Sequence, residues 1–146
     1  QARMLSQLVD WFYNVPLLQG LIVEAARIEP DFWPRFLGFM TARIEPTPGP
    51  SLEARFRYLD QYLEGQTPGL RHRLHYQWLK AGFSPRHGLC PTVPWKKPIP
   101  DGAILVEGEA SVQPARIIQA RLDNEYLFVF GSGVSRQACA IYRISG

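Results

Sequence analysis

The side chains with the most obvious chemical potential lie in one stretch, residues 70–97. This stretch holds all three histidines of the chain, His72, His75 and His87, and one of the two cysteines, Cys90. They follow the pattern H-x2-H-x11-H-x2-C, and short gaps between paired nitrogen and sulfur ligands are typical of small zinc sites. The pattern therefore predicts zinc as a candidate cofactor, provided that the segments carrying the two pairs meet. The alternative is that the histidines are exposed or hydrogen-bonded, since the neighbouring arginines would repel a cation.

The same stretch is strongly basic. Residues 66–100 carry six basic and no acidic side chains, whereas the rest of the chain carries ten basic and thirteen acidic ones. The net charge is therefore +6 in residues 66–100 and −3 in the rest of the chain. Basic side chains neutralise phosphates, and aromatic side chains stack on unpaired bases. We therefore expect this stretch to contact nucleic acid or an acidic protein surface, the alternative being a solvated face without a partner. The side chains predicted to make the contact are Arg71, Arg73, Tyr76, Lys80, Arg86, Trp95, Lys96 and Lys97.

Other chemistry has weaker support. The chain contains neither a phosphate-binding glycine-rich loop nor a G-x-S-x-G nucleophile elbow, and no pair of acidic residues stands out as an acid–base couple. A Cys90 thiolate activated by His87 would need a geometry that a proline-rich loop rarely holds. We therefore expect a non-enzymatic interaction module of a larger protein or assembly. One alternative is a small zinc-dependent domain or enzyme that uses the histidine–cysteine cluster. Another is a protein–protein adaptor that uses the aromatic helices near the amino terminus.

The elements that must position these residues begin with helices, over residues 1–82. Apolar side chains recur at helical spacing, and the predicted helices cover residues 3–13, 16–29, 32–44, 52–65 and 68–81. Ser51 is a candidate N-cap, Pro68 suits the first position of the last helix, and Gly65 and Gly82 suit helix ends. The last helix has an apolar stripe for the core and a basic, aromatic outer face. With the helix before it, this helix could form a helix-turn-helix, with the hairpin of residues 115–131 as a wing.

The pattern changes from helix to strand after a proline-rich loop. The loop covers residues 83–102, and the strand-like runs that follow it, within residues 103–146, are 103–109, 115–121, 125–131 and 137–144. The run 126–130 is apolar on both faces, which predicts a central strand covered by the helices. Together the elements predict an α+β fold, with about five amino-terminal helices followed by a small three- to four-stranded antiparallel sheet.

The overall composition is that of one soluble globular domain, with 146 residues, 46% hydrophobic and 20% charged. No apolar run is long enough to cross a membrane and no signal-peptide pattern is visible, so we expect a cytoplasmic protein without a membrane partner. The low cysteine count predicts that Cys90 and Cys139 are free thiols, with a disulfide between them as the alternative. The chain begins at Gln1 rather than Met. We therefore expect a domain excised from a longer protein, whose other domains would be further partners.

Overall fold

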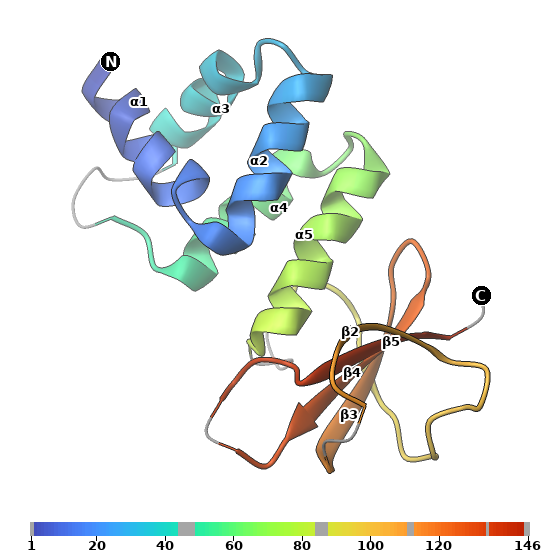
Figure 1. Cartoon of the computed structure of the whole chain (residues 1–146). Coiled ribbons are helices and arrows are strands. Elements are labelled where there is room, and N and C mark those ends of the chain that lie inside the picture. Colours follow the sequence, from blue (N-terminus) through green and yellow to red (C-terminus); the bar gives the residue numbers. More distant parts are fainter. Residues whose placement is uncertain (1, 44–48, 84–87, 111–112, 134, 145–146) are drawn as a thin grey trace. The chain divides into compact units, whose positions relative to one another are not determined.

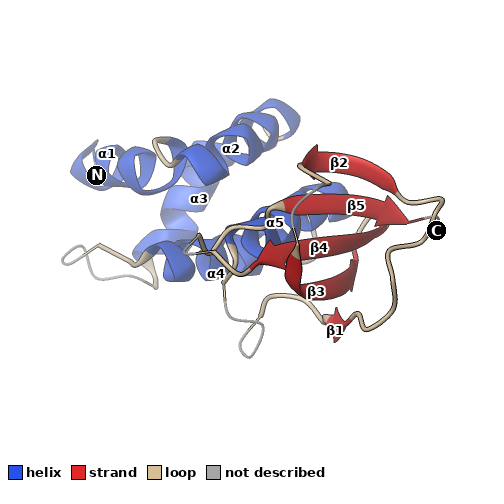
Figure 2. Ribbon diagram, turned by 60° about the horizontal axis from the view of Figure 1, so that its bottom comes forward, coloured by secondary structure: helices blue, strands red, loops and turns tan. Residues whose placement is uncertain are grey.

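The computed structural model describes residues 2–43, 49–83, 88–110, 113–133 and 135–144 (Figure 1). In this part of the chain a series of helices is followed by an antiparallel sheet (Figure 2), which confirms the predicted α+β class. The fold divides into two compact units, Gln1–Leu74 and His75–Gly146, and the boundary falls inside the last helix. We refer to them as the first and the second unit. The prediction of a single domain stays a prediction.

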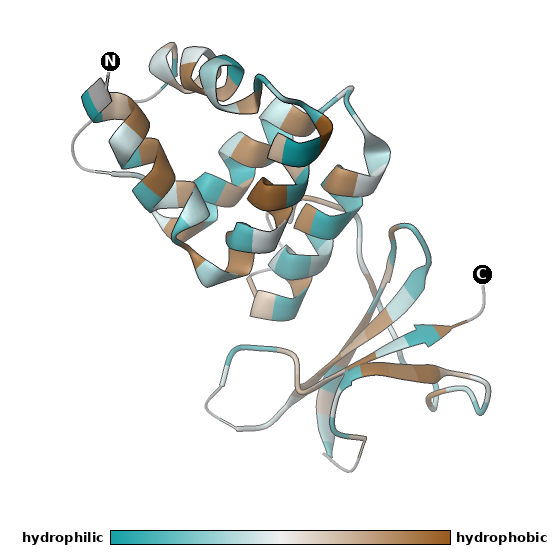
Figure 3. Cartoon of the chain, turned by 45° about the horizontal axis from the view of Figure 1, so that its top comes forward, coloured by the Kyte–Doolittle hydropathy of each residue, from teal (hydrophilic) through white to brown (hydrophobic). Residues whose placement is uncertain are grey.

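The first unit is helical. Its elements are α1 (Ala2–Leu8), the π-helical turn η1 (Val9–Tyr13), α2 (Pro16–Ile28), α3 (Phe32–Thr41), α4 (Leu52–Leu63) and the beginning of α5 (Pro68–Ala81). Apolar and polar residues alternate along these helices (Figure 3), as expected for helices with one buried face. The main difference from the prediction is at residues 3–13, which form α1 and η1 rather than one α-helix. The backbone N–H of Asn14 donates to the carbonyl of Val9 at 2.9 Å, which is the wide hydrogen bond of a π-helix.

Local sequence signals start and stop these helices, as predicted. The hydroxyl of Ser51 caps α4 by accepting a hydrogen bond from the backbone N–H of Ala54 at 3.1 Å. Pro68 occupies the first position of α5, where its missing N–H costs nothing. Gly65 and Gly82 follow α4 and α5 with a φ of 82°, the left-handed conformation in which many helices end.

An aromatic cluster forms the centre of the first unit. The side chain of Phe36 is fully buried, and its ring centre lies 4.9 Å from that of Phe12, 5.1 Å from that of Tyr62 and 5.3 Å from that of Phe32. The contacts with Phe12 and Tyr62 are edge to face, a favourable arrangement for aromatic rings. The hydroxyl of Tyr62 donates to Glu29 Oε1 at 2.6 Å, and burial, together with this hydrogen bond, raises the pKa of Tyr62 to about 12. Tyr62 is therefore a protonated donor at neutral pH.

The second unit is built on the sheet, which has five strands within the described residues. The strands are β1 (Val93–Pro94), β2 (Ile104–Gly108), β3 (Pro114–Arg121), β4 (Glu125–Gly131) and β5 (Ala140–Ile144). Their order is β1-β3-β4-β5-β2, and every neighbouring pair is antiparallel. Residues 126–130 of β4 are all buried, so the predicted central strand is confirmed. Because β3 also pairs with β1 and β4 with β5, the hairpin 115–131 forms the middle of the sheet rather than a free wing.

The strand beyond the predicted three or four is β1, and it lies inside the predicted loop 83–102. Val93 pairs with Gln119 and Pro94 with Ile118. A strand of two residues has no alternating pattern, and proline cannot donate to a strand ladder and is therefore confined to sheet edges. Only its pairing with β3 makes this segment a strand, and the segment therefore has no local sequence pattern from which the strand could be predicted.

The part of α5 that belongs to the second unit packs on the sheet. The ring centre of Tyr76 lies 5.4 Å from that of Tyr126 and 5.5 Å from that of Phe128, both on β4. Beyond the sheet, the backbone N–H of Ala138 donates to the carbonyl of Lys80 at 2.9 Å. These contacts fix the carboxyl-terminal end of the helix within its unit. None of the helices in the described ranges is both long and apolar enough to cross a membrane.

Candidate functional site

Two of the predicted basic residues on α5 already have carboxylate partners. In the first unit, Arg71 donates from Nε to Asp60 Oδ1 at 2.8 Å and from Nη2 to Oδ2 at 3.2 Å. In the second unit, Lys80 Nζ lies 2.6 Å from Glu107 Oε1. Each positive charge is balanced locally, so an anionic partner would have to compete with the carboxylate already in place. Arg73 is exposed and makes no ion pair with a carboxylate in the part of the chain that the structure describes.

Tyr76 and Lys80 share the carboxylate of Glu107. The hydroxyl of Tyr76 donates to Oε2 of this carboxylate, while Lys80 binds Oε1. Burial by itself would raise the pKa of Glu107, but the hydrogen bonds from Lys80 and Tyr76 hold it below its ordinary value of 4.5. Burial and the hydrogen bond to Glu107 also raise the pKa of Tyr76. The three side chains therefore tie α5 to β2, and Tyr76 serves as a packed and protonated donor.

Replacing Glu107 with glutamine is expected to lower the free energy of unfolding at neutral pH by about 1 kcal/mol, because it removes a partly exposed ion pair. A carboxylate with a lowered pKa stabilises the fold above its unfolded pKa, and this stabilisation is lost as the pH falls through its folded pKa. The difference in the free energy of unfolding between the wild type and Glu107→Gln should therefore be largest well above pH 4.5 and should shrink below it. Urea denaturation at a series of pH values measures it. A difference that persists unchanged in acid would contradict this role of Glu107.

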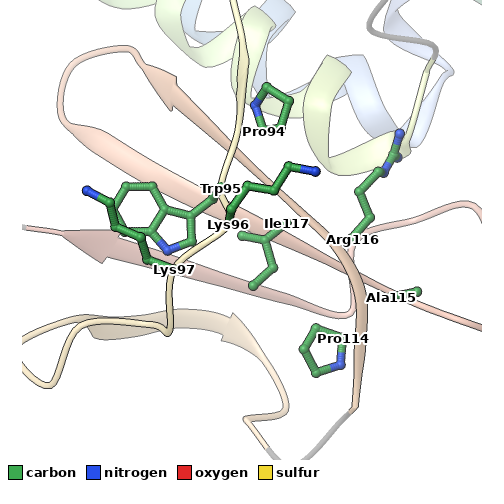
Figure 4. A pocket seen from close by; sticks show the side chains of 8 residues that line it. All are labelled: Pro94, Trp95, Lys96, Lys97, Pro114, Ala115, Arg116 and Ile117. Atoms are coloured by element: carbon green, nitrogen blue, oxygen red, sulfur yellow. The ribbon is translucent and has the colours of Figure 1, made fainter.

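Two further basic residues of the predicted site, Lys96 and Lys97, line a groove of about 320 Å³ at the β1–β3 edge of the sheet (Figure 4). One wall comes from the segment that follows β1, and the other from the start of β3. Its lining consists of Pro94, Trp95, Lys96, Lys97, Pro114, Ala115, Arg116 and Ile117. We call this site the basic groove. It lies entirely within the second unit.

The pairing of β1 with β3 positions the residues of the basic groove. The backbone N–H of Trp95 donates to the carbonyl of Ile117 at 2.9 Å, which continues the β1–β3 ladder by one hydrogen bond. This pairing, at Val93–Pro94 and at Trp95, keeps the neighbouring Lys96 close to the start of β3. In Figure 4 the side chain of Lys96 reaches towards that of Arg116.

Three positive charges in the basic groove have no carboxylate partner. Lys96, Lys97 and Arg116 are exposed, and none of them makes an ion pair with an acidic residue in the described ranges. Two of them, Lys97 and Arg116, contact aromatic rings. Lys97 Nζ lies 5.3 Å from the ring centre of Trp95, and the guanidinium carbon of Arg116 lies 4.5 Å from the ring centre of Phe130. The basic groove is thus a local concentration of positive charge that has no carboxylate partner among the described residues and has Trp95 in its lining, and such a charge concentration attracts anions.

The sequence pattern identifies two of these three cations and misses Arg116. Lys96 and Lys97 stand next to Trp95 in the basic stretch, whereas Arg116 is one of two arginines in a strand outside it. No local signal distinguishes Arg116 from other exposed strand residues. It belongs to the groove only because β3 pairs with β1.

The structure describes three of the four residues of the predicted zinc site. His72 is half-buried on the first-unit part of α5, His75 is buried at the start of the second unit, and Cys90 is half-buried in the loop before β1. His87 lies outside the described residues, as does Arg86 of the predicted binding surface. Among the described residues, no group of three or more histidine, cysteine, aspartate or glutamate side chains is arranged to hold a metal ion. Zinc binding stays a prediction.

The two cysteines are not joined by a disulfide, as predicted. Cys139 Sγ lies 3.3 Å from the carbonyl oxygen of Val129, as a weak donor within the second unit.

Neither a protein-family model, nor a curated protein, nor a solved structure matches this chain. The candidate site therefore rests on its own geometry and charge.

Proposed function

We propose that this chain is a non-enzymatic interaction module that binds nucleic acid through the basic groove. The observation that supports this function is the combination of three exposed cations, which have no carboxylate partner among the described residues, with an indole ring in one groove. Cations bind phosphates and release their counterions, while an aromatic ring offers a surface to a base. A carboxylate side chain would engage the cations but not the indole, whereas every nucleotide carries both a phosphate for the cations and a base for the ring, so nucleic acid uses more of the site.

The other predicted surfaces support a function less well. Arg71 and Lys80 of the predicted helix face are engaged by Asp60 and Glu107. The aromatic residues proposed for an adaptor lie largely in the core of the first unit, where Phe12, Phe32 and Phe36 are buried and Trp11, Trp33 and Phe39 are half-buried. Neither surface combines accessible charge with an aromatic platform.

The proposed function predicts a specific change in the salt dependence of binding. The test variant is Lys96→Gln/Lys97→Gln, assayed by fluorescence anisotropy with a short labelled single-stranded oligonucleotide between about 50 and 200 mM salt. Each phosphate contact contributes about 0.7 to the slope of log K against log salt for a single strand. Losing two such contacts should weaken binding at low salt and reduce the slope by about 1.4. An unchanged affinity and slope would refute the proposal.

The matched control is Arg3→Gln/Arg143→Gln. It removes the same net charge from two exposed arginines that do not line the basic groove. This variant should keep most of the affinity and most of the salt slope of the wild type. If both double variants lose binding equally, overall net charge drives the interaction and the groove is not the site. If an acidic peptide binds through Lys96 and Lys97 while the oligonucleotide does not bind, the partner is an acidic protein and not nucleic acid.

A further inference from the structure

Trp95 is held in place by two hydrogen bonds, one from its backbone and one from its indole. Its backbone N–H donates to the carbonyl of Ile117 at 2.9 Å, and its ring Nε1–H donates to the carbonyl of Pro98 at 3.4 Å. The ring is half-buried, Trp95 is part of the lining of the basic groove, and in Figure 4 the ring lies on the same side of its backbone segment as Lys97. Because Pro98 already accepts the only donor of the ring, a ligand has no hydrogen bond to gain from Trp95. What the ring still offers is its flat aromatic surface.

The surroundings of the ring combine an apolar surface with charge. Lys97 Nζ lies 5.3 Å from its centre, and Lys96 and Arg116 line the same groove. A nucleotide has a matching division into an aromatic base and a charged phosphate. The volume of about 320 Å³ is at the lower end of the range of about 300 to 1,000 Å³ that is usual for small-ligand pockets. This space suits one nucleotide rather than the body of a double helix.

We infer that Trp95 is a stacking platform for one unpaired nucleobase, so that the basic groove selects single-stranded over double-stranded nucleic acid. This inference rests on the proposed function and names its ligand class. In a duplex each base is stacked on its neighbours and its faces are closed to a side chain, whereas unpaired bases can stack on aromatic rings. Stacking accepts every base, because each has an aromatic face, so we expect little sequence preference.

The test removes the indole and the base in turn. Wild type, Trp95→Ala and Trp95→Phe are titrated with a single-stranded oligonucleotide, with a backbone-matched oligonucleotide whose sugars carry no bases, and with a duplex. Loss of one stacked base is expected to weaken single-strand binding roughly 5- to 150-fold in Trp95→Ala. Trp95→Phe, which keeps an aromatic ring, should lose less. Affinity for the abasic strand and for the duplex should be nearly the same in all three proteins.

Two further measurements separate stacking from other effects of the substitution. Thermal unfolding of each variant shows whether the fold is kept, and Trp95→Phe provides a ring-bearing comparison if Trp95→Ala is destabilised. Tryptophan fluorescence of the wild type should be quenched by the single strand, and this quenching should largely disappear in Trp95→Phe.

The outcomes distinguish this inference from the proposed function. If Trp95→Ala weakens binding of the abasic and the normal strand equally, or if the wild type binds duplex as tightly as single strand, Trp95 is not a base platform. In that case the basic groove can still be a phosphate site, provided that Lys96→Gln/Lys97→Gln reduces the salt slope. If no nucleic acid binds the wild type at low salt, the proposed function and the inference both fail.

Discussion

Replacing Gly82 with alanine is expected to lower the free energy of unfolding by about 3 kcal/mol, mainly by disrupting the second unit. Gly82 has a φ of 82°, a conformation that is strained for a residue with a side chain. An added Cβ would overlap the carbonyl oxygen of Arg136 and would lie 2.7 Å from its carbonyl carbon. The segment cannot easily move away, because the N–H of Ala138 is bound to the carbonyl of Lys80. Urea denaturation followed by circular dichroism measures the loss.

Gly65→Ala is the matched control for this substitution. Gly65 has the same φ of 82°, but nothing lies within 4 Å of an added Cβ. Its replacement therefore introduces the backbone strain without the overlap and should cost only about 1 to 2 kcal/mol. If Gly82→Ala and Gly65→Ala destabilise the protein equally, the close approach of Arg136 to Gly82 contributes nothing.

Replacing Phe36 with alanine should cost about 3 to 5 kcal/mol, through the core of the first unit. The side chain is fully buried, and its ring contacts those of Phe12, Phe32 and Tyr62. Truncation removes both the buried apolar surface and the edge-to-face contacts, and it leaves a cavity among rings that cannot all move inward. The measurement is again the free energy of unfolding in urea.

Two control variants bracket this result. Phe36→Leu keeps most of the buried volume and should cost clearly less than Phe36→Ala. Val23→Ala removes an apolar side chain that is 51% exposed on α2, and its effect should stay within about 0.5 kcal/mol. A small effect of Phe36→Ala, comparable to that of Val23→Ala, would show that the aromatic cluster does not hold the first unit together.

The helices could be predicted from the sequence because their signals are local. A cap such as Ser51, a proline in the first turn and a glycine after the last turn act on neighbouring backbone atoms. The apolar repeat of a helix extends over a few turns and can be read without knowledge of its partner. The same applies to β4, whose run of buried residues predicts a central strand. By contrast, β1 has two residues and no pattern, and only its partner β3 makes it a strand.

The binding site could be predicted only in part, because charge balance is a property of the folded chain. The basic stretch is visible in the sequence, but Asp60 and Glu107, which neutralise Arg71 and Lys80, lie outside it. In the sequence, α5 and the predicted loop 83–102 carry the same number of basic residues. Folding leaves Lys96 and Lys97 without an acidic partner among the described residues while it pairs two of the helix cations.

The sequence by itself determined the order of helices and strands, the apolar residues that form their buried faces, and the presence of a basic aromatic segment at residues 70–97. These properties depend on residue type and on spacing along the chain. The tertiary structure decided which of those charges remain available. The β1–β3 pairing brings Arg116 into the lining of the same groove as Trp95 and Lys96, whereas Asp60 engages Arg71, and Glu107 engages Tyr76 and Lys80. The stretch that first suggested one continuous binding face is thus, in the folded chain, a largely engaged helix followed by a basic groove.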